Sequence, residues 1–265
     1  MSMDASSHSE LDRICDLVRA CGRIIRDVDR TGLHVASKEG KANFVTEYDK
    51  LVQDRLQAGL REIVPDARFV GEEGSADRYS PKGKYFVVDP IDGTTNFIKD
   101  FHISSISVAL IVDGAAELAV VHNPYTDEMF SARRGGGVFC NGKPIHVSAE
   151  PLERGIVVFG TAPYHVELAQ PTFDLAFRYF RKALDIRRCG SAALDLCSVA
   201  AGRAELFFEL TLAPWDHAAG GLIVQEAGGT ISDFDGGPLA FDHDCAVLAR
   251  GAGVSDADIE RPECR

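Results

Sequence analysis

The spacing of apolar residues predicts two amphipathic helices near the start of the chain. Within residues 11–28 apolar side chains recur every three or four positions, which is helical spacing, and Gly32 is the expected stop. These apolar positions are Leu11, Ile14, Cys15, Val18, Cys21, Ile25 and Val28. A second helix is predicted over residues 46–64, and the polar residues 33–43 predict a loop between the two. The buried side of the second helix is expected to be formed by Leu51, Val52, Leu56, Leu60 and Ile63.

Shorter apolar runs bounded by turn residues predict strands from residue 68 onward. In the first half these strands span residues 68–70, 85–88, 105–112, 117–122, 129–132 and 138–140. Asp113-Gly114 lies between the third and fourth of these runs and predicts a hairpin. After residue 151, predicted helices at 172–184, 192–201 and 216–227 interleave with strands at 156–159, 204–208 and 246–249. The polar segment 251–265 is expected to fray.

This interleaving of strands and helices argues for layered α/β or α+β packing. The chain has 265 residues, enough for one large domain or two tightly packed halves. Residues 151–154 are the expected seam. We therefore predict an N-terminal α+β half at 1–150 and a C-terminal α/β half at 151–265, packed as one globular unit with the active site between them.

The segment from Tyr85 to Phe97 carries the strongest chemical signal. Its apolar run ends in two carboxylates, Asp89 and Asp92, and Pro90 between them lacks the N–H group that regular strand pairing needs. The following Gly-Thr-Thr sequence permits a sharp turn and places hydroxyl and N–H groups where a helix can start. Two acids beside such groups suit a divalent cation that is bridged to a phosphate.

Two further segments carry matching chemistry. Gly71-Glu72-Glu73-Gly74 places acids in a turn after an apolar run, and Asp216 lies at the start of a predicted helix within Pro-Trp-Asp-His-Ala-Ala-Gly-Gly. Asp216 can also cap that helix, which is compatible with metal binding. Together with the Asp-Pro-Ile-Asp-Gly-Thr-Thr-Asn-Phe segment, and in this order and spacing, these motifs resemble those of the inositol monophosphatase family of magnesium-dependent, lithium-sensitive phosphatases.

The resemblance implies a fold and a set of metal ligands. The fold is a layered α-β-α-β-α sandwich of the inositol monophosphatase and fructose-1,6-bisphosphatase type. Two to three Mg²⁺ ions are expected, with Mn²⁺ as an alternative and Li⁺ as an inhibitor. The first ion would be held by Glu72, Asp89 and the carbonyl group of Ile91, and the second by Asp89, Asp92 and Asp216. A third, loosely held ion would rest on Glu72 and water.

The resemblance also implies catalytic and substrate-binding roles. Glu72 and Thr94 would orient the attacking water, and Asp49 would hydrogen-bond Thr94. The residues alone give Asp49 a second interpretation of equal weight, because Thr46 and Asp49 have the spacing of a helix capping box. Lys38 would lie in a mobile loop near the metals. The expected substrate contacts are Asp92, Gly93, Thr94, Thr95, Gly190, Ser191, Ala192, Glu209 and Asp216.

The function expected from these motifs is hydrolysis of inositol 1-phosphate or a similar polyol or sugar monophosphate. The same site would also suit fructose 1,6-bisphosphate, histidinol phosphate or 3′-phosphoadenosine 5′-phosphate; Glu209 and the intact Trp215-Asp216 pair favour inositol over the last two. Asn43, where many relatives have Asp, and Gly74, where Ser is more usual, leave the substrate open. An accessory factor of the transcription machinery is the alternative from another class of protein.

The composition of the chain disfavours several classes of binding partner. The net charge of −12 disfavours nucleic acid and anionic membrane, and no apolar run is long enough to cross a bilayer. Residues 1–10 lack the apolar core of a signal peptide. Seven cysteines without a Cys-x-x-Cys pair argue against a zinc site or a disulfide framework. We therefore expect reduced thiols and a cytoplasmic location. The family resemblance implies a homodimer and a small phosphate ester as the binding partner.

Overall fold

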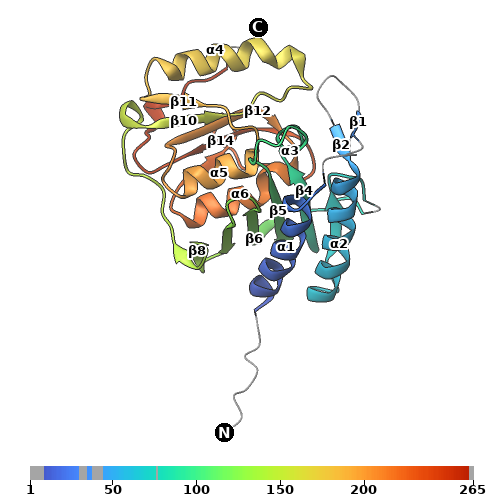
Figure 1. Ribbon diagram of the computed structural model, residues 1–265. Coiled ribbons are helices and arrows are strands. Elements are labelled where there is room, and N and C mark those ends of the chain that lie inside the picture. The colour runs from blue at the N-terminus through green and yellow to red at the C-terminus, as the bar shows by residue number, and fades with distance from the viewer. Residues whose placement is uncertain (1–8, 30–34, 38–43, 76, 263–265) are drawn as a thin grey trace.

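The computed structural model describes residues 9–29, 35–37, 44–75 and 77–262 (Figure 1). Predictions were made for Gly32, Lys38 and Asn43, and these three residues lie outside the described ranges. The α-helices are α1 (Glu10–Arg26), α2 (Glu47–Ile63), α3 (Thr94–Ile98), α4 (Ala169–Phe180), α5 (Ala192–Ala200) and α6 (Pro214–Glu226). Short 3₁₀ turns are η1 (Leu152–Arg154), η2 (Val166–Leu168) and η3 (Asp256–Asp258).

The first half of the chain forms a seven-stranded sheet in sequence order. Its strands are β3 (Arg68–Gly71), β4 (Lys84–Asp92), β5 (Ser105–Val112), β6 (Ala115–Asn123), β7 (Glu128–Arg133), β8 (Gly137–Cys140) and β9 (Lys143–Pro144). Only the β3–β4 pair is parallel in this sheet. The predicted hairpin through Asp113-Gly114 is confirmed as the β5–β6 connection, since Asp113 has a positive φ that such a turn requires.

The second half forms a five-stranded mixed sheet in the order β11-β10-β12-β14-β13. Its strands are β10 (Ile156–Phe159), β11 (Asp185–Arg187), β12 (Leu206–Leu212), β13 (Thr230–Ser232) and β14 (Cys245–Arg250). β10 pairs in parallel with β11 and β12, and β14 pairs antiparallel with β12 and β13. A separate two-stranded ribbon joins β1 (Val35–Ser37) to β2 (Phe44–Thr46).

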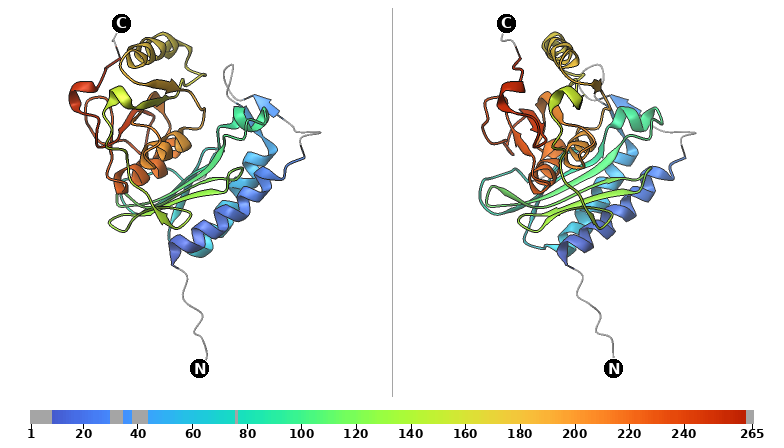
Figure 2. Two further views of the ribbon diagram at one scale, coloured as in Figure 1. Left: turned by 60° about the vertical axis from the view of Figure 1, so that its left-hand side comes forward. Right: turned by 90° about the vertical axis from the view of Figure 1, so that its left-hand side faces the viewer.

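The two sheets and the helices stack in alternating layers (Figure 2). Helices α1 and α2 cover one face of the seven-stranded sheet, α5 and α6 lie between the two sheets, and α4 covers the outer face of the five-stranded sheet. The predicted α-β-α-β-α sandwich is therefore confirmed. The central core draws on both halves of the chain, since Val87 and Phe130 share it with Leu196, Phe207 and Ala219. The division at residue 150 stays a prediction.

Several element boundaries differ from the prediction. Helix α1 ends at Arg26, before the predicted stop, and Leu51 on α2 is 47% exposed although it was expected on the buried side. Residues 35–37 of the predicted loop form β1. Helix α6 begins at Pro214, where its fixed φ suits the first turn, so Asp216 is the third helical residue and not the cap. The strands β11 and β13 were missed because three residues carry too little periodicity to be recognised.

The C-terminal segment was expected to fray, but residues 251–262 pack against the second half. Arg250 donates to Asp256, the Tyr179 hydroxyl accepts a hydrogen bond from the Glu260 N–H group at 3.0 Å, and Lys182 forms an ion pair with Glu260. Val254 is buried in the core beneath α4. For residues 251–262 the prediction of fraying was wrong, because it weighed polarity and overlooked these contacts; residues 263–265 lie outside the described residues. In the described part of the chain, no helix combines the length and the apolar character that crossing a membrane requires.

Candidate active site

A bulge in β4 brings Asp89 and Asp92 to the same face of the sheet. Tyr85 and Val87 point to the central core while Phe86 and Val88 point to the α1/α2 side, which is ordinary strand alternation. Two residues three positions apart would then point to opposite faces. However, Asp89 pairs with Ser107 and Asp92 with Ser105, so two residues of β4 lie opposite one residue of β5.

This extra residue shifts the alternation by one and returns Asp92 to the side of Asp89. Pro90 lies in the bulge, where its missing N–H group interrupts no ladder hydrogen bond. The prediction that Pro90 disturbs pairing is therefore correct. The predicted end of the strand at residue 88 is wrong, because the strand resumes after the bulge and reaches Asp92.

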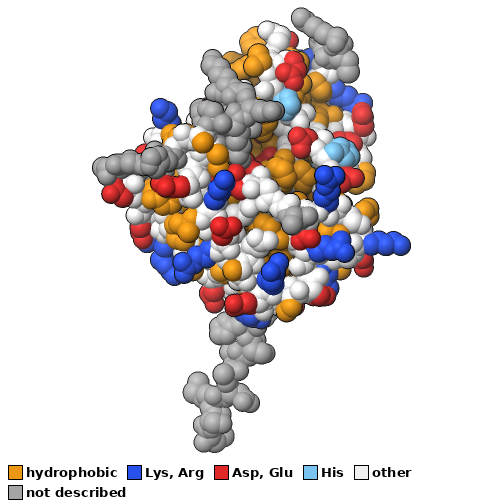
Figure 3. All heavy atoms as spheres, turned by 90° about the vertical axis from the view of Figure 1, so that its right-hand side faces the viewer, with side chains coloured by type: hydrophobic (Ala, Val, Ile, Leu, Met, Phe, Trp, Pro, Cys, Tyr) orange, Lys and Arg blue, Asp and Glu red, His pale blue; other side chains and the backbone are white. Residues whose placement is uncertain are grey.

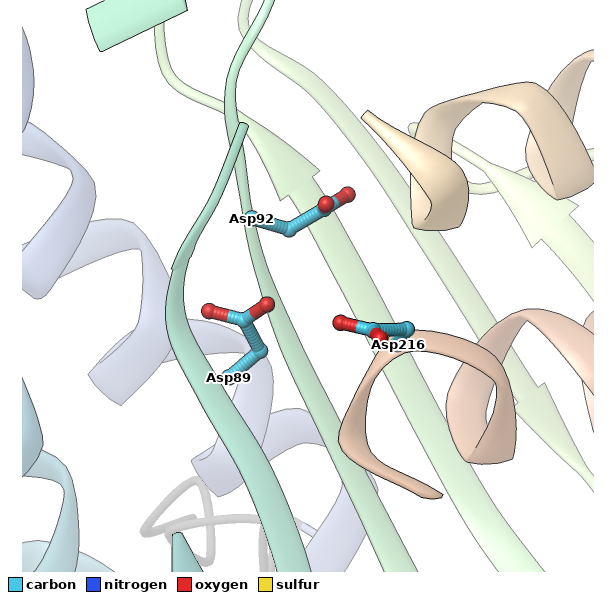
Figure 4. Close-up of side chains that lie close together, drawn as sticks. All are labelled: Asp89, Asp92 and Asp216. Atoms are coloured by element: carbon cyan, nitrogen blue, oxygen red, sulfur yellow. The ribbon is translucent and has the colours of Figure 1, made fainter. Parts of the chain in front are cut away.

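Asp216 approaches these two acids from the second half of the chain. It lies in the first turn of α6, where its Oδ2 accepts a hydrogen bond from the Ala213 N–H group at 2.9 Å. One carboxylate oxygen from each of Asp89, Asp92 and Asp216 lies within 4.8 Å of the other two. In Figure 4 the side chains of Asp89 and Asp92 leave β4 and the side chain of Asp216 leaves α6, so that all three carboxylates face one space.

Burial raises the pKa values of all three acids, and repulsion by neighbouring acids adds to this for Asp89 and Asp216. For Asp89 burial is the largest cause, and Glu72 is the strongest source of repulsion. For Asp216 burial followed by repulsion from Asp92 raises the pKa well above its ordinary value. A cation between the three carboxylates would replace this repulsion with attraction. The donor atoms are hard carboxylate oxygens, so the triad fits a divalent cation of the Mg²⁺ or Mn²⁺ kind.

Asp92 also connects the two halves. The Ser191 hydroxyl and the Ala193 N–H group donate to its Oδ2, and the Ala192 N–H group donates to its Oδ1 at 3.2 Å. Ser105 adds a further hydroxyl donor at 3.2 Å. Burial raises the pKa of Asp92, and these hydrogen bonds lower it. The carboxylate of Asp92 thus holds the first turn of α5 against the bulge.

The residues expected to orient water lie around the same space. Glu72 follows β3, lines the cavity and raises the pKa values of Asp89 and Asp216. The Thr94 hydroxyl donates to the carbonyl oxygen of Ile91 at 3.2 Å. The capping box of α2 is formed: Asp49 Oδ2 accepts from the Thr46 N–H group at 2.7 Å and from its hydroxyl at 2.6 Å. The expected hydrogen bond between the Thr94 hydroxyl and the Asp49 carboxylate stays a prediction; Asp49 is buried and its charge acts on Asp89.

These side chains surround a cavity of ≈ 130 Å³. Figure 3 shows a hollow on one face of the molecule, with acidic and hydrophobic side chains below the surrounding surface. Every expected metal ligand and substrate contact lines this cavity; the lining residues are Glu72, Asp89, Ile91, Asp92, Gly93, Thr94, Thr95, Gly160, Pro163, Tyr164, Arg188, Gly190, Ser191, Ala192, Asp195, Glu209, Leu212 and Asp216.

Glu209 lies in the wall that the second half contributes. Its Oε1 accepts a hydrogen bond from the Ala162 N–H group at 2.8 Å. A side chain at Gly160 would place a Cβ atom 1.8 Å from Glu209 Oε2, so only glycine leaves room for this carboxyl group. Burial raises the pKa of Glu209 to about 7, and the nearby Arg188 partly opposes this effect.

Sequence reasoning missed Tyr164, Arg188 and Asp195 at the cavity. Arg188 and Asp195 flank the Gly-Ser-Ala motif, and Asp195 lies one helical turn after Ser191, which is a signal that was available. Tyr164 lies in a connection without a recognisable pattern, and only the fold brings it to the site. Burial and the nearby acids Asp216 and Glu209 raise its pKa.

Comparisons with known proteins agree with this site. A family model described as the inositol monophosphatase family matches residues 7–259. Nus factor SuhB of Escherichia coli K12 is 38% identical over 232 residues, which cover 87% of each chain. Inositol monophosphatase 3 of Solanum lycopersicum is 36% identical over 268 residues, which cover 98% of each chain.

Solved structures show the same fold at similar identity. The extragenic suppressor protein suhB from Bartonella henselae superimposes with a TM-score of 0.83 at 32% identity, covering 91% of this chain and 93% of that one. The Thermotoga maritima IMPase superimposes with a TM-score of 0.81 at 33% identity, covering 92% of each. By its sequence, its fold and the acids gathered at its cavity, the chain belongs to the inositol monophosphatase family.

Proposed function

We propose that the protein is a magnesium-dependent phosphatase that hydrolyses inositol 1-phosphate to inositol and phosphate. The observation that carries this proposal is the convergence of Asp89, Asp92 and Asp216 from both halves of the chain on one cavity. Membership in the family supports a phosphate ester as the substrate. The solved structure of a staphylococcal inositol monophosphatase, 27% identical to this chain, with inositol monophosphate bound supports the choice of ester.

Two to three Mg²⁺ ions would be held by the residues that the motifs indicate. Glu72, Asp89 and the Ile91 carbonyl group would hold one, and Asp216 with Asp89 and Asp92 would hold another. When bound, such cations neutralise phosphoryl charge, lower the pKa of a water molecule and stabilise the leaving oxygen. Lithium, which is small and singly charged, would compete at the second place; a lithium titration at constant ionic strength tests this.

The chain's own residues would bind and orient the reactants. Glu72 and Thr94 orient the attacking water, and Asp49 keeps the Thr94 hydroxyl in position. The N–H groups of Gly93 and Thr94 would hold the phosphate oxygens, and Thr95 would add a further contact to the substrate. On the opposite wall, the Glu209 carboxylate accepts hydrogen bonds from neighbouring hydroxyls of the alcohol, beside the Gly190-Ser191-Ala192 turn.

The test is a phosphate-release screen with magnesium. Inositol 1-phosphate is compared with fructose 1,6-bisphosphate, histidinol phosphate and 3′-phosphoadenosine 5′-phosphate at equal concentrations. The proposal expects the highest kcat/KM for inositol 1-phosphate. A higher kcat/KM for another ester would identify that ester as the preferred substrate and leave the assignment of the active site unchanged. If no ester were hydrolysed, the phosphatase proposal would be overturned.

A second candidate function is that of an accessory factor in transcription. The observation that favours it is the 38% identity to a protein named Nus factor SuhB. The net charge of −12 points to a protein partner and disfavours direct contact with nucleic acid. Purified protein should then be retained by immobilised RNA polymerase with or without magnesium. Loss of the interaction when chelator is added would tie it to the metal site, and no retention would remove this candidate.

We also propose a homodimer, in which α4 contributes to the contact. Phe173, Phe177 and Phe180 lie on one face of this helix and are 56%, 60% and 53% exposed. An exposed row of three aromatic side chains is typical of an interaction surface. Sedimentation should show a dimer for the wild-type protein and a monomer for Phe177→Asp. A monomeric wild-type protein at micromolar concentration would contradict this proposal.

A further inference from the structure

Arg188 is the only basic residue among the described residues that line the cavity, where it stands among six acids. It follows β11 and precedes the Gly190-Ser191 turn, so it lies on the wall that the second half contributes. Its positive charge lowers the pKa values of Glu209 and Asp195. Arg188 therefore acts electrostatically on the part of the cavity where the alcohol of a substrate is expected.

The guanidinium group of Arg188 has a defined position. Its Nη2 donates to the Thr161 hydroxyl at 3.2 Å. Gly190 has a positive φ, and a Cβ atom there would lie 2.6 Å from Nη1 of Arg188. Glycine at this position therefore both permits the turn and allows the guanidinium to pack directly over the backbone that enters α5.

The hydrogen-bonding capacity of Arg188 is largely unused within the described part of the chain. A guanidinium group has five N–H donors, and the one side-chain bond of Arg188 goes to a neutral hydroxyl. The preceding residue, Arg187, differs: it forms an ion pair with Asp185 and donates to the Ile186 carbonyl oxygen at 2.8 Å. In a chain with 40 acidic and 28 basic residues, an arginine that faces a cavity without a carboxylate partner is available to a ligand.

We propose that Arg188 is a specificity-determining residue that binds a second anionic group on the alcohol part of the substrate. A planar guanidinium forms two parallel hydrogen bonds with a phosphate or a carboxylate, and this geometry is its strongest mode of recognition. Between two phosphate monoesters with otherwise similar alcohols, the one that carries a further oxyanion is then favoured. This inference rests on the proposed phosphatase function and refines its substrate class.

The neighbouring acids do not prevent such binding. Glu209 is buried and its pKa is raised to about 7, so a large share of it is uncharged near neutral pH. Repulsion of a second anion by Glu209 is then reduced. The exposed position of Arg188 leaves its other N–H groups open to a ligand that enters the cavity.

Two matched pairs of esters test the proposal. Fructose 1-phosphate and fructose 1,6-bisphosphate differ by a second phosphate, with hydrolysis of the latter followed as formation of fructose 6-phosphate. Glycerol 2-phosphate and 2-phosphoglycerate differ by a carboxylate. For each pair we divide kcat/KM of the ester with the second anionic group by kcat/KM of the ester without it. This ratio is measured with magnesium for wild type, Arg188→Gln, Arg188→Lys and the control Arg187→Gln.

The expected wild-type ratio exceeds one in at least one pair, which identifies the anionic group that is bound. In Arg188→Gln that ratio should fall at least about tenfold, mainly through KM, because charge-assisted hydrogen bonds are lost. Arg188→Lys should restore part of this ratio, because lysine keeps the positive charge but lacks the planar guanidinium that forms two parallel hydrogen bonds. Arg187→Gln should stay within about twofold of wild type, as expected for a surface change away from the cavity.

Hydrolysis of glycerol 2-phosphate separates this proposal from the one on which it rests. If wild type and Arg188→Gln hydrolyse it at similar rates and no pair shows a preference that depends on Arg188, the second-anion proposal is overturned and the phosphatase proposal stands. If wild type hydrolyses none of the four esters or inositol 1-phosphate with magnesium, both proposals are wrong.

Discussion

At the scale of single residues, the bulge at Pro90 decides whether Asp89 and Asp92 can act together. Without the extra residue, these aspartates would point to opposite faces of β4, one toward α6 and the other toward α1. The sequence indicated disturbed pairing at Pro90, because a residue without an N–H group cannot stay in a regular central strand. The faces of β4 to which the two aspartate side chains point could not be predicted from sequence, because they depend on the register of the pairing between β4 and β5.

The acid triad predicts that removing one charge abolishes activity without weakening the fold. Asp216→Asn keeps the volume of the side chain and relieves the repulsion that raises the pKa of Asp89. The metal-free variant should melt at or above the wild-type temperature. The rise in melting temperature on adding magnesium should be lost, and turnover should fall at least about a hundredfold.

Asp174→Asn on α4 is the matched control, because Asp174 lies on the outer layer and bonds only Gln170 within the described residues. Its magnesium response and turnover should equal those of wild type. Near wild-type turnover of Asp216→Asn at saturating magnesium would show that Asp216 does not contribute to the reaction.

Glu209 predicts a pH dependence of stability. Its pKa is raised from 4.5 to about 7 in the folded protein, so protonation favours the folded state, and this contribution is lost as pH rises from about 4.5 through 7. Between pH 5 and pH 8 the metal-free wild type should therefore lose roughly 2 kcal/mol more unfolding free energy than Glu209→Gln. Urea denaturation at both pH values measures the difference.

The same variant separates recognition from chemistry. Glu209→Gln should raise KM for inositol 1-phosphate and leave hydrolysis of a small generic ester such as glycerol 2-phosphate nearly unchanged, because Glu209 is proposed to contact the alcohol part of the substrate. Equal losses on both esters would place Glu209 in the catalytic machinery. A stability difference that is the same at pH 5 and pH 8 would contradict the raised pKa.

At the scale of elements, long periodic segments were predictable and their ends were not. The apolar spacing located α1, α2 and the β5–β6 hairpin because each buries one side or both sides against a large sheet. Leu51 was misplaced because helical spacing alone does not fix how far around the helix the sheet reaches. The start of α6 was misplaced because Asp216 has the chemistry of a cap, whereas Pro214 fixes the first turn.

The N-cap of α5 leads to a prediction about the free energy of unfolding. The Ser191 hydroxyl accepts from the Leu194 N–H group as the N-cap and donates to Asp92. Ser191→Ala should lower the unfolding free energy by about 1–2 kcal/mol, the usual effect of losing such a cap. Urea denaturation of the magnesium-free protein is the measurement.

Ser198→Ala is the control for this cap. Ser198 lies in the same helix, and its hydroxyl donates to the Leu194 carbonyl oxygen, a local bond that adds little to helix stability. Its unfolding free energy should stay within about 0.5 kcal/mol of wild type. If the two variants are equally stable, the link from Ser191 to Asp92 does not support α5.

At the scale of the whole molecule, the site is a product of the layered packing. The three motifs indicated Glu72, Asp89, Asp92 and Asp216, and the structure brings all four to one cavity. Tyr164 could not be placed from sequence, because its position at the cavity follows from how the five-stranded sheet lies against the bulge of β4. Arg188 and Asp195 flank the Gly190-Ser191-Ala192 motif, and this signal was not used. Motifs thus predicted the acids, while the shape of the alcohol side required the fold.

The measurement that tests the central claim most directly is phosphate release from inositol 1-phosphate with and without free divalent cation. Protein is assayed in excess chelator, then with Mg²⁺ restored above the chelator, and Asp216→Asn is carried through the same steps. We predict no turnover in chelator, full recovery with Mg²⁺ for wild type and no recovery for Asp216→Asn. Undiminished turnover of wild type in excess chelator would contradict a metal-dependent reaction at the Asp89, Asp92 and Asp216 triad.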